Sequence, residues 1–433
     1  MNELIIRGGR LAGEDSAVDV HITDGVITRV SPSGAQDSDQ AAGAVVVDAV
    51  GCIVMPSFID LHTHTREPGK PQAEDAQTAS AAAAAGGYGV IHAMANTTPV
   101  ADTPEAMDVV WRRGRELGLV DIRPVGAVTR GLAGQELAPI AAMHDTQAQP
   151  TLFSDDGHCV DRADLMRAAL REVARFGGVI AQHAQESTLT AGAQANEGEV
   201  AKQLGLPGWP GVAEAAIVAR DVLLAADTGS RLHVCHVSTA ATVEVLRWAK
   251  SRGVQVTAEV TPHHLILTDE LITTGDAVYK VNPPLRSEAD VVAVREALAD
   301  GTIDAVATDH APHEDSAKSC AWSAAAMGMT GLETALGVVW LTMVQTGLID
   351  ESRLIEVMSY APARIGSLTT PVIAEGAPAR LTVIDPSATW SVDPSRSLSR
   401  SRNTPFAGHT LPVTIRATVH DGVVTYARER SNA

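Results

Sequence analysis

Cysteine is scarce in this sequence. The 433 residues include four cysteines, Cys52, Cys159, Cys235 and Cys320, which lie far apart and form no Cys-x-x-Cys pair. A disulfide framework or a zinc site built from thiolates is therefore not expected, and a reducing, cytoplasmic compartment fits this composition.

Positively charged residues and long apolar runs are also rare in this sequence. Lys and Arg number 33 against 52 Asp and Glu, a net charge of -19 that argues against a nucleic-acid or anionic-membrane partner. Residues 1–11, MNELIIRGGRL, lack the pattern of a signal peptide. Residues 76–101 carry no charge, but this Ala- and Gly-rich segment contains His92 and Asn96. It fits a helix followed by a buried strand better than a membrane span.

The motifs of nucleotide-binding folds are missing as well. No Gly-x-Gly-x-x-Gly opens a helix after the first strand, and no Walker A sequence occurs. The GGYG at 86–89 precedes a strand, which makes it a turn. With 45% apolar and 20% charged residues the chain has the composition of a folded globular protein, but not the signals of a nucleotide-binding one.

The two ends of the chain resemble each other. Residues 1–55 alternate as short strands with a hairpin turn at Asp24-Gly25, and the C-terminal segment does the same around Asp421-Gly422. This pattern predicts one small β domain assembled from both termini.

The middle of the chain, residues 56–370, alternates short apolar runs with helical patterns. In residues 238–252 the apolar positions Val243, Leu246 and 248–249 recur at near-helical spacing, and Ser238 or Thr239 can cap the helix. Six or more such β-then-α units favour an α/β fold of the (β/α)8 barrel type over an open sheet.

Many of the apolar runs end in a histidine or an aspartate. Because the carboxyl ends of barrel strands meet at one face, these side chains are expected to converge there. His62 and His64 are two residues apart, so both point to the same side of their strand. The strand ends concerned carry His62, His64, Asp155, Asp156, His183, His236, Asp309 and His310.

Imidazoles and carboxylates without thiolates suit Zn²⁺, Mn²⁺ or Co²⁺ at an open catalytic site. One histidine at a strand end is more often structural than a ligand, but its repetition over several strands favours a metal site. A carboxylate shared by two metals is expected from FSDDG, and Asp309 is placed to transfer a proton. Cys235 is expected to point away from His236 and to pack, and His263 and His264 are candidates for an outer layer. Six other histidines are expected to be structural or superficial: His92, His144, His158, His233, His409 and His420.

These segments resemble a known family over nearly the whole chain. The matching motifs are DLHTHTREPG, MANTTP, FSDDG, HAQE, HVSTAAT, AEVTPHHL, KVNPPLR, ATDHAPH, GMTGLETAL and NTPFAG. They are similar to those of the bacterial type I dihydroorotases, within the metal-dependent amidohydrolase superfamily. The resemblance implies a distorted (β/α)8 TIM barrel over residues 56–370, with a small β-sandwich accessory domain formed by residues 1–55 and 371–433.

The resemblance also implies a site with two Zn²⁺ ions per subunit, for which Mn²⁺ or Co²⁺ could substitute. His62 and His64 would bind one ion with Asp309, His183 and His236 the other, and Asp156 would bridge them, with Asp155 as the alternative. TLFSDDG contains no lysine, which argues against the hydantoinase and allantoinase branches. The substrate contacts implied are His64, Arg66, Asn96, Asn282, His313, Met327 and Gly328. The chain departs from the family at Ala95, at Ala326-Met327 and in HAQE.

The activity implied is the reversible hydrolysis of the cyclic amide of (S)-dihydroorotate to N-carbamoyl-L-aspartate in pyrimidine biosynthesis, with Asp309 as the catalytic proton carrier. A homodimer, and association with aspartate transcarbamoylase, belong to the same expectation. Two alternatives are a hydantoinase- or allantoinase-like cyclic amidohydrolase and a non-catalytic partner of aspartate transcarbamoylase. The first alternative is distinguished by the substrate, because only a substrate with a free carboxylate needs the contacts that Arg66 and His313 would make. The complete set of six candidate ligands argues against the second.

Overall fold

Two parallel sheets form the centre of the protein, a computed structural model that describes residues 3–34 and 43–428. The first has the order β6-β7-β8 and the second β15-β14-β13-β10-β9. Parallel bridges join Gly126 to Phe153 and Thr63 to His310, so each edge of one sheet contacts an edge of the other. The strands are β6 (Phe58–Thr63), β7 (Tyr88–Ala93), β8 (Asp121–Pro124), β9 (Leu152–Phe153), β10 (Val179–Gln182), β13 (Arg231–Val234), β14 (Val256–Val260) and β15 (Ala305–Val306).

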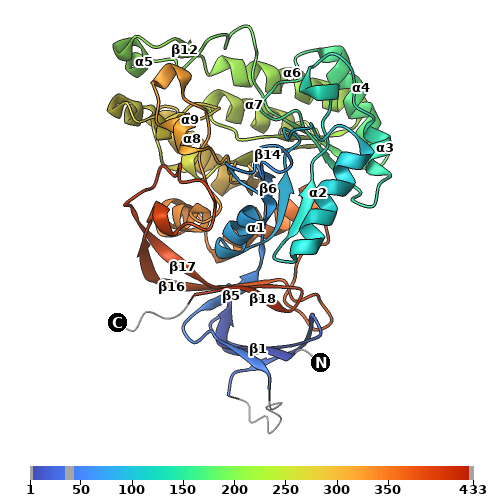
Figure 1. The fold of residues 1–433 in the computed structure, drawn as a ribbon, viewed down its shortest axis with the longest axis vertical. Helices are drawn as coiled ribbons and strands as arrows, with labels where there is room; N and C mark the ends of the chain where they lie inside the picture. The colour runs from blue at the N-terminus through green and yellow to red at the C-terminus, as the bar shows by residue number, and fades with distance from the viewer. Residues whose placement is uncertain (1–2, 35–42, 429–433) are drawn as a thin grey trace.

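Helices alternate with these strands along the chain and lie around them (Figure 1). A two-stranded sheet, β11 (Ala195–Asn196) and β12 (Gly208–Trp209), lies in the connection after β10. The helices are α1 (Ala76–Ala85), α2 (Pro104–Leu117), α3 (Ile140–His144), α4 (Ala163–Ala174), α5 (Glu199–Leu204), α6 (Val212–Thr228), α7 (Ala240–Ser251), α8 (Glu288–Asp300), α9 (Asp315–Lys318), α10 (Ala335–Val339), α11 (Glu351–Ile355) and α12 (Ala361–Ile365). The π-helical segments η6 (Trp340–Val344) and η7 (Glu356–Tyr360) continue α10 and α11.

The local sequence signals explain several of these elements. The side chain of Thr239 accepts a hydrogen bond from the Thr242 amide and caps α7, as predicted, and Val243 and Leu246 are buried. Trp248, another apolar position of this pattern, is 44% exposed and lies outside the buried face of the helix. The uncharged segment forms the Ala-rich helix α1 and the fully buried strand β7, as expected from its composition.

The ends of the chain share a separate eight-stranded sheet. Its order is β18-β17-β16-β5-β1-β2-β3, with β4 paired to β1, and the antiparallel pair β5–β16 joins the N-terminal strands to the C-terminal ones. The first and last strands of the chain, β1 and β18, both lie at this end of the molecule (Figure 1). The strands are β1 (Glu3–Leu11), β2 (Ala17–Thr23), β3 (Val26–Pro32), β4 (Val45–Asp48), β5 (Ile53–Pro56), β16 (Leu381–Ser391), β17 (Thr410–His420) and β18 (Val423–Ala427).

The two predicted hairpin turns occur in this sheet. Asp24 and Gly25 have φ of 47° and 86°, and Asp421 and Gly422 have φ of 47° and 79°, as two-residue turns with left-handed central residues require. The turns also touch each other, because a Cβ on Gly422 would lie 2.6 Å from the Cα of Gly25. Glycine is therefore needed at 422 for both its conformation and the close approach.

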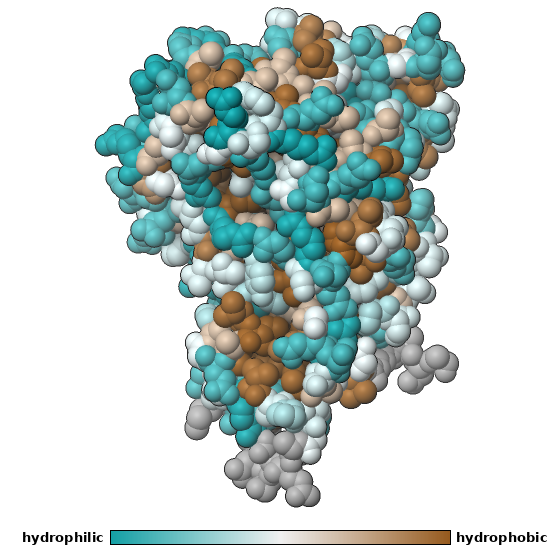
Figure 2. All heavy atoms as spheres, turned by 180° about the vertical axis from the view of Figure 1, so that it is seen from behind, coloured by the Kyte–Doolittle hydropathy of each residue, from teal (hydrophilic) through white to brown (hydrophobic). Residues whose placement is uncertain are grey.

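Hydrophobic residues on the surface form patches separated by hydrophilic ones, as Figure 2 shows for one face. Among residues 3–34 and 43–428, no helix is both long enough and apolar enough to cross a membrane.

His92 on β7 is one of the histidines predicted to be structural, and the structure buries it. Its Nδ1 lies 3.0 Å from the carbonyl oxygen of Asp60, and burial lowers the pKa of His92 to about 4. The unfolded chain binds this proton near pH 6.5, so the neutral imidazole stabilises the fold above that pH. The stability is lost as the pH falls from about 6.5 towards 4.

We expect His92 to contribute about 2 kcal/mol to the loss of folding stability between pH 7 and pH 5. In His92→Asn, whose amide can still donate to the Asp60 carbonyl, the difference in unfolding free energy between the two pH values should shrink by that amount. Urea titrations of wild type and variant at both pH values measure it. His409→Asn, at an exposed histidine, should leave the difference unchanged; an equal effect of both substitutions would refute the assignment.

Candidate metal centre

The carboxyl ends of the parallel strands bring the predicted residues together. His62 lies on β6 and His64 one residue after it, and Asp156, His183, His236 and Asp309 follow the strands β9, β10, β13 and β15. All six residues are at most 5% exposed. Parallel strands place these ends at the same edge, which is why residues far apart in sequence meet.

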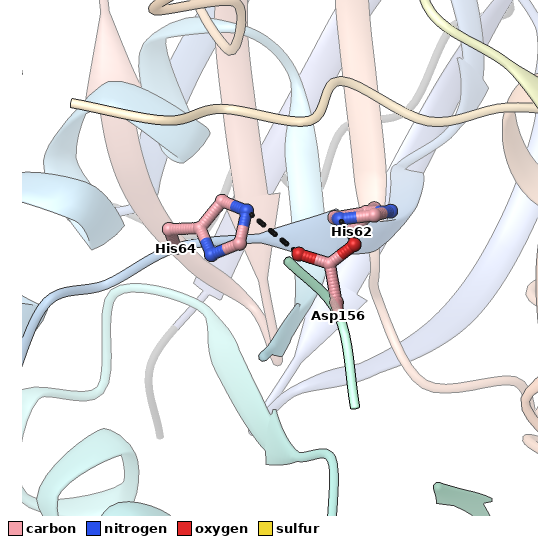
Figure 3. A group of neighbouring side chains, drawn as sticks. All are labelled: His62, His64 and Asp156. Atoms are coloured by element: carbon pink, nitrogen blue, oxygen red, sulfur yellow. Dashed lines mark ion pairs between the residues drawn. The ribbon is translucent and has the colours of Figure 1, made fainter. Parts of the chain in front are cut away.

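The first group of side chains is formed by His62, His64, Asp156 and Asp309. The two imidazoles project from the same strand towards the Asp156 carboxylate (Figure 3), with His62 Nε2 3.2 Å from Oδ1 and His64 Nε2 3.3 Å from Oδ2. Asp309 Oδ1 lies 3.1 Å from His64 Nε2 and 3.6 Å from His62 Nε2. Two ligand atoms on one tetrahedral zinc are about 3.3 Å apart, given metal–ligand bonds near 2.0 Å, so this spacing suits a shared cation.

The second group contains Asp156 again, with His183 and His236. Asp156 Oδ1 is 3.2 Å from His183 Nδ1 and 3.4 Å from His236 Nε2, and those two nitrogens are 2.9 Å apart. Among the described residues, Asp156 is the one carboxylate that belongs to both of these metal-compatible groups. Asp155 points elsewhere: its Oδ1 accepts hydrogen bonds from the amides of Val128 and Thr129. The geometry thus favours Asp156 over Asp155 as the shared ligand.

The imidazoles are oriented from outside the cluster. His62 Nδ1 lies 2.8 Å from Glu259 Oε1, and His64 Nδ1 lies 2.9 Å from Asn96 Oδ1. A neutral imidazole that donates at Nδ1 presents its Nε2 lone pair on the other side. His62 Nε2 is buried without a hydrogen-bond partner in the described structure, although it faces two carboxylates. A divalent cation would satisfy this nitrogen and the carboxylates together, so the residues fit a metal site.

The charges of the cluster compensate one another. Burial disfavours the imidazolium, but the carboxylates of Asp156 and Asp309 outweigh it and raise the pKa of His62 well above its usual value. Burial would raise the pKa of Asp156, but the surrounding imidazoles hold it well below its usual range. The site therefore favours positive charge between its carboxylates, which a metal can supply.

The backbone is strained where the strands end. His236 and Asp309 have φ of 36° and 43°, in the left-handed region that non-glycine residues rarely adopt. This turn corrects the prediction for Cys235, whose sulfur lies within 4.8 Å of ligand atoms of His62 and Glu259. Cys235 faces the same side as His233, whose Nε2 also contacts Glu259, so Cys235 does not point away from the site as expected.

Arg66 and Asn96 lie beside the cluster. Arg66 Nε donates to the Pro312 carbonyl at 3.1 Å, which leaves its Nη1 and Nη2 groups for a ligand. Asn96 is already engaged on both sides, because its Oδ1 is bonded to His64 and its Nδ2 donates to the Asp156 carbonyl oxygen at 3.3 Å. Asn96 is thus a support for the candidate ligands as well as a candidate substrate contact.

The other predicted substrate contacts come from two loops that meet beside the cluster. His313 Nε2 lies 2.8 Å from the carbonyl oxygen of Met327, and a Cβ on Gly328 would come within 2.9 Å of the same nitrogen. Burial and the neighbouring Arg66 lower the pKa of His313 to about 3, so it is neutral. Asn282 Nδ2 lies 3.1 Å from Gln185 Oε1.

Sequence reasoning missed two residues that contact the candidate ligands. Glu259 is on β14, and Gln185 Oε1 lies 2.9 Å from His183 Nε2. Glu259 was detectable as a charged residue within an apolar run, while Gln185 gave no comparable signal. His263 and His264, candidates for an outer layer, are buried and contact each other with ring centroids 4.6 Å apart.

Imidazoles and carboxylates at the carboxyl ends of parallel strands, with one carboxylate facing two groups, define a metal-dependent hydrolase of the amidohydrolase class. Comparison with known proteins narrows this class. Residues 51–242 match the family model described as dihydro-orotase-like.

The chain belongs to the dihydroorotase family. It is 54% identical to a dihydroorotase of Streptomyces coelicolor over 98% of this chain and the whole of that protein. It is 53% identical to a dihydroorotase of Mycobacterium tuberculosis, with 98% of each chain covered.

Solved structures of related enzymes share the fold. The L-hydantoinase (dihydropyrimidinase) of Arthrobacter aurescens superposes with a TM-score of 0.84 at 26% identity, covering 98% of this chain and 96% of that one. The dihydropyrimidinase of Brevibacillus agri gives a TM-score of 0.82 at 21% identity, covering 98% and 94%.

Proposed function

We propose that this protein is a dihydroorotase that hydrolyses the cyclic amide of (S)-dihydroorotate reversibly to N-carbamoyl-L-aspartate, in pyrimidine biosynthesis. Two zinc ions per subunit are the proposed cofactors, with Mn²⁺ or Co²⁺ as substitutes. The observation that carries the proposal is the position of Asp156 between two pairs of buried histidines, in a chain of this family.

The architecture belongs to the same proposal. We infer that the two parallel sheets, bridged at both edges, make one closed and distorted (β/α)8 barrel over residues 56–370. Residues 1–55 and 371–433 then form a β-sandwich accessory domain around the shared sheet of the termini. The cytoplasmic location, the homodimer and the association with aspartate transcarbamoylase stay predictions.

In the proposed reaction, water adds across the ring amide, the bond between carbonyl carbon and nitrogen breaks, and a proton reaches the departing nitrogen. Metal ions held by the six ligands would polarise the carbonyl and lower the pKa of water to about 7. Asp309, next to His64 at 3.1 Å, takes the proton from the attacking water and delivers it to the ring nitrogen. Arg66 pairs with the substrate carboxylate through its guanidinium fork.

A substrate panel tests the proposal. Dihydroorotate, dihydrouracil, hydantoin and allantoin should be compared at equal enzyme concentration, with zinc content measured on the same sample. The resemblance to the L-hydantoinase structure makes hydantoin hydrolysis the second candidate. Preference for dihydroorotate supports the proposal, and preference for the uncharged rings contradicts it.

Arg66 should determine the preference for dihydroorotate over the uncharged rings. In Arg66→Gln we expect kcat/KM for dihydroorotate to fall about 10- to 100-fold, because hydrogen bonds to charged groups contribute about 1.5–3 kcal/mol. The rate of dihydrouracil hydrolysis should change little, because dihydrouracil lacks the carboxylate. Arg113→Gln, at an arginine that pairs with Glu67 outside the cluster, is the matched control. Equal losses on both substrates would rule out the carboxylate contact.

A further inference from the structure

A chain of hydrogen-bonded side chains lies behind His62, on the side away from the carboxylate cluster. His62 Nδ1 is 2.8 Å from Glu259 Oε1, and Glu259 Oε2 is 3.0 Å from His233 Nε2. His233 Nδ1 is in turn 2.9 Å from Thr257 Oγ1. His62, Glu259 and His233 are at most 1% exposed. The chain connects β6, β14 and β13.

The protons of this chain can be assigned in one consistent way. With the Thr257 hydroxyl as the donor to His233 Nδ1, the proton of the His233 imidazole lies on Nε2. That proton is donated to one oxygen of Glu259, and the proton on His62 Nδ1 is donated to the other oxygen. Each contact then uses one proton, which leaves the Nε2 lone pair of His62, beside Asp156 and Asp309, for a metal ion.

We propose that Glu259 and His233 are positioning residues that hold His62 in the tautomer and orientation needed to bind the first metal ion. This inference rests on the proposed metal site. A histidine that ligates a metal is oriented, and made more basic, by a carboxylate that accepts its second N–H. Here that carboxylate is itself held by a second histidine.

The burial of Glu259 supports a specific role. A carboxylate without access to water is costly unless hydrogen bonds compensate it, and both oxygens of Glu259 receive one from an imidazole. A purely structural link between three strands would not need a charge at this position. The alternative is nevertheless that Glu259 only ties the strands together, so the experiment must separate metal affinity from folding stability.

Glu259→Gln tests the proposal, with Glu74→Gln as the matched control. Glu74 is a fully buried glutamate, 3.3 Å from His310 Nε2, outside the metal-compatible groups found in the described residues. Zinc affinity is measured by competition with a chelator, the site geometry by the visible absorption of the Co²⁺ form, and stability by the melting temperature of the metal-free protein.

The affinity for one of the two metal ions should fall about 10- to 100-fold in Glu259→Gln, with an altered Co²⁺ spectrum. In Glu74→Gln the metal affinity and the Co²⁺ spectrum should remain as in the wild type, whatever the change in melting temperature. Wild-type zinc affinity in Glu259→Gln, or an equal loss of affinity in both variants, would overturn the proposal.

A second pair of variants covers the case in which Glu259→Gln does not fold. In His233→Gln the side-chain amide can still donate to Glu259, whereas in His233→Leu it cannot. We expect zinc affinity to be retained in the first and weakened in the second, and equal affinities would overturn the proposal. Because these comparisons measure metal binding, they hold even if the substrate panel were to reject dihydroorotate, which would refute only the proposed function.

Discussion

Asp309→Asn should reduce the turnover of dihydroorotate by about 10³-fold or more while most of the zinc remains bound. General acid–base catalysis by one positioned group contributes about 10²- to 10⁴-fold. The amide has the shape of the carboxylate and keeps one oxygen near His62 and His64, from which Asp309 Oδ1 is separated by 3.6 and 3.1 Å. It cannot accept the proton of the attacking water, so the chemical step should fail although the cluster persists.

The experiment compares kcat and zinc per chain in Asp309→Asn, the wild type and Asp304→Asn. Asp304 lies just before β15 at the opposite end of the same strand and pairs with Lys250. The control should keep both turnover and zinc. Substantial turnover in Asp309→Asn would show that another group carries the proton, whereas loss of zinc would make Asp309 above all a ligand.

The positions of the six candidate ligands could be predicted because one physical rule covers them. Strands in a parallel sheet end at the same edge, so histidines and aspartates that follow apolar runs must meet if the fold is α/β. The spacing of His62 and His64 added that both face the same side. Nothing in this reasoning depends on the distances between strands, which is why it succeeds for residues as far apart as 62 and 309.

The rule that strand ends meet at one edge fails where the backbone leaves the extended conformation. It also misses a contacting residue that lies within a strand instead of at its end. Cys235 was misplaced because the chain turns at His236, whose φ of 36° is not visible in a sequence pattern. Glu259 was missed because its partner His62 is 197 positions away, on a strand of the other sheet, and only the folded chain brings the two side chains together. Long-range contacts of this kind follow from the assembled fold, not from local periodicity.

Local sequence patterns also could not decide whether Asp155 or Asp156 is the shared ligand. The structure leads to a prediction on this point. Both residues follow the same strand, and the sequence favours Asp156 only through the family resemblance. In the structure, Asp155 accepts hydrogen bonds from two backbone amides, Val128 and Thr129, whereas Asp156 lies among the imidazoles. The Asp155 carboxylate therefore organises the loop, and the Asp156 carboxylate would bind the proposed metals.

Asp156→Asn should lose bound zinc and dihydroorotate turnover together. Asp156 is the shared member of both groups, and its removal leaves four imidazoles and the single carboxylate of Asp309 for the two proposed divalent cations. Charge repulsion between the cations would no longer be offset, and four imidazoles supply no negative charge. Zinc per chain after gel filtration and kcat for dihydroorotate measure the two effects.

Asp155→Asn is the matched control, one residue away and equally buried in the loop. It should retain zinc and lower the melting temperature, because the neutral amide accepts the hydrogen bonds of Val128 and Thr129 less strongly than the carboxylate does. The reverse outcome, with zinc lost in Asp155→Asn and kept in Asp156→Asn, would assign the bridge to Asp155. Retention of zinc in both variants would mean that no carboxylate of this loop is shared by two metals, and a single-ion site would then have to explain the four histidines.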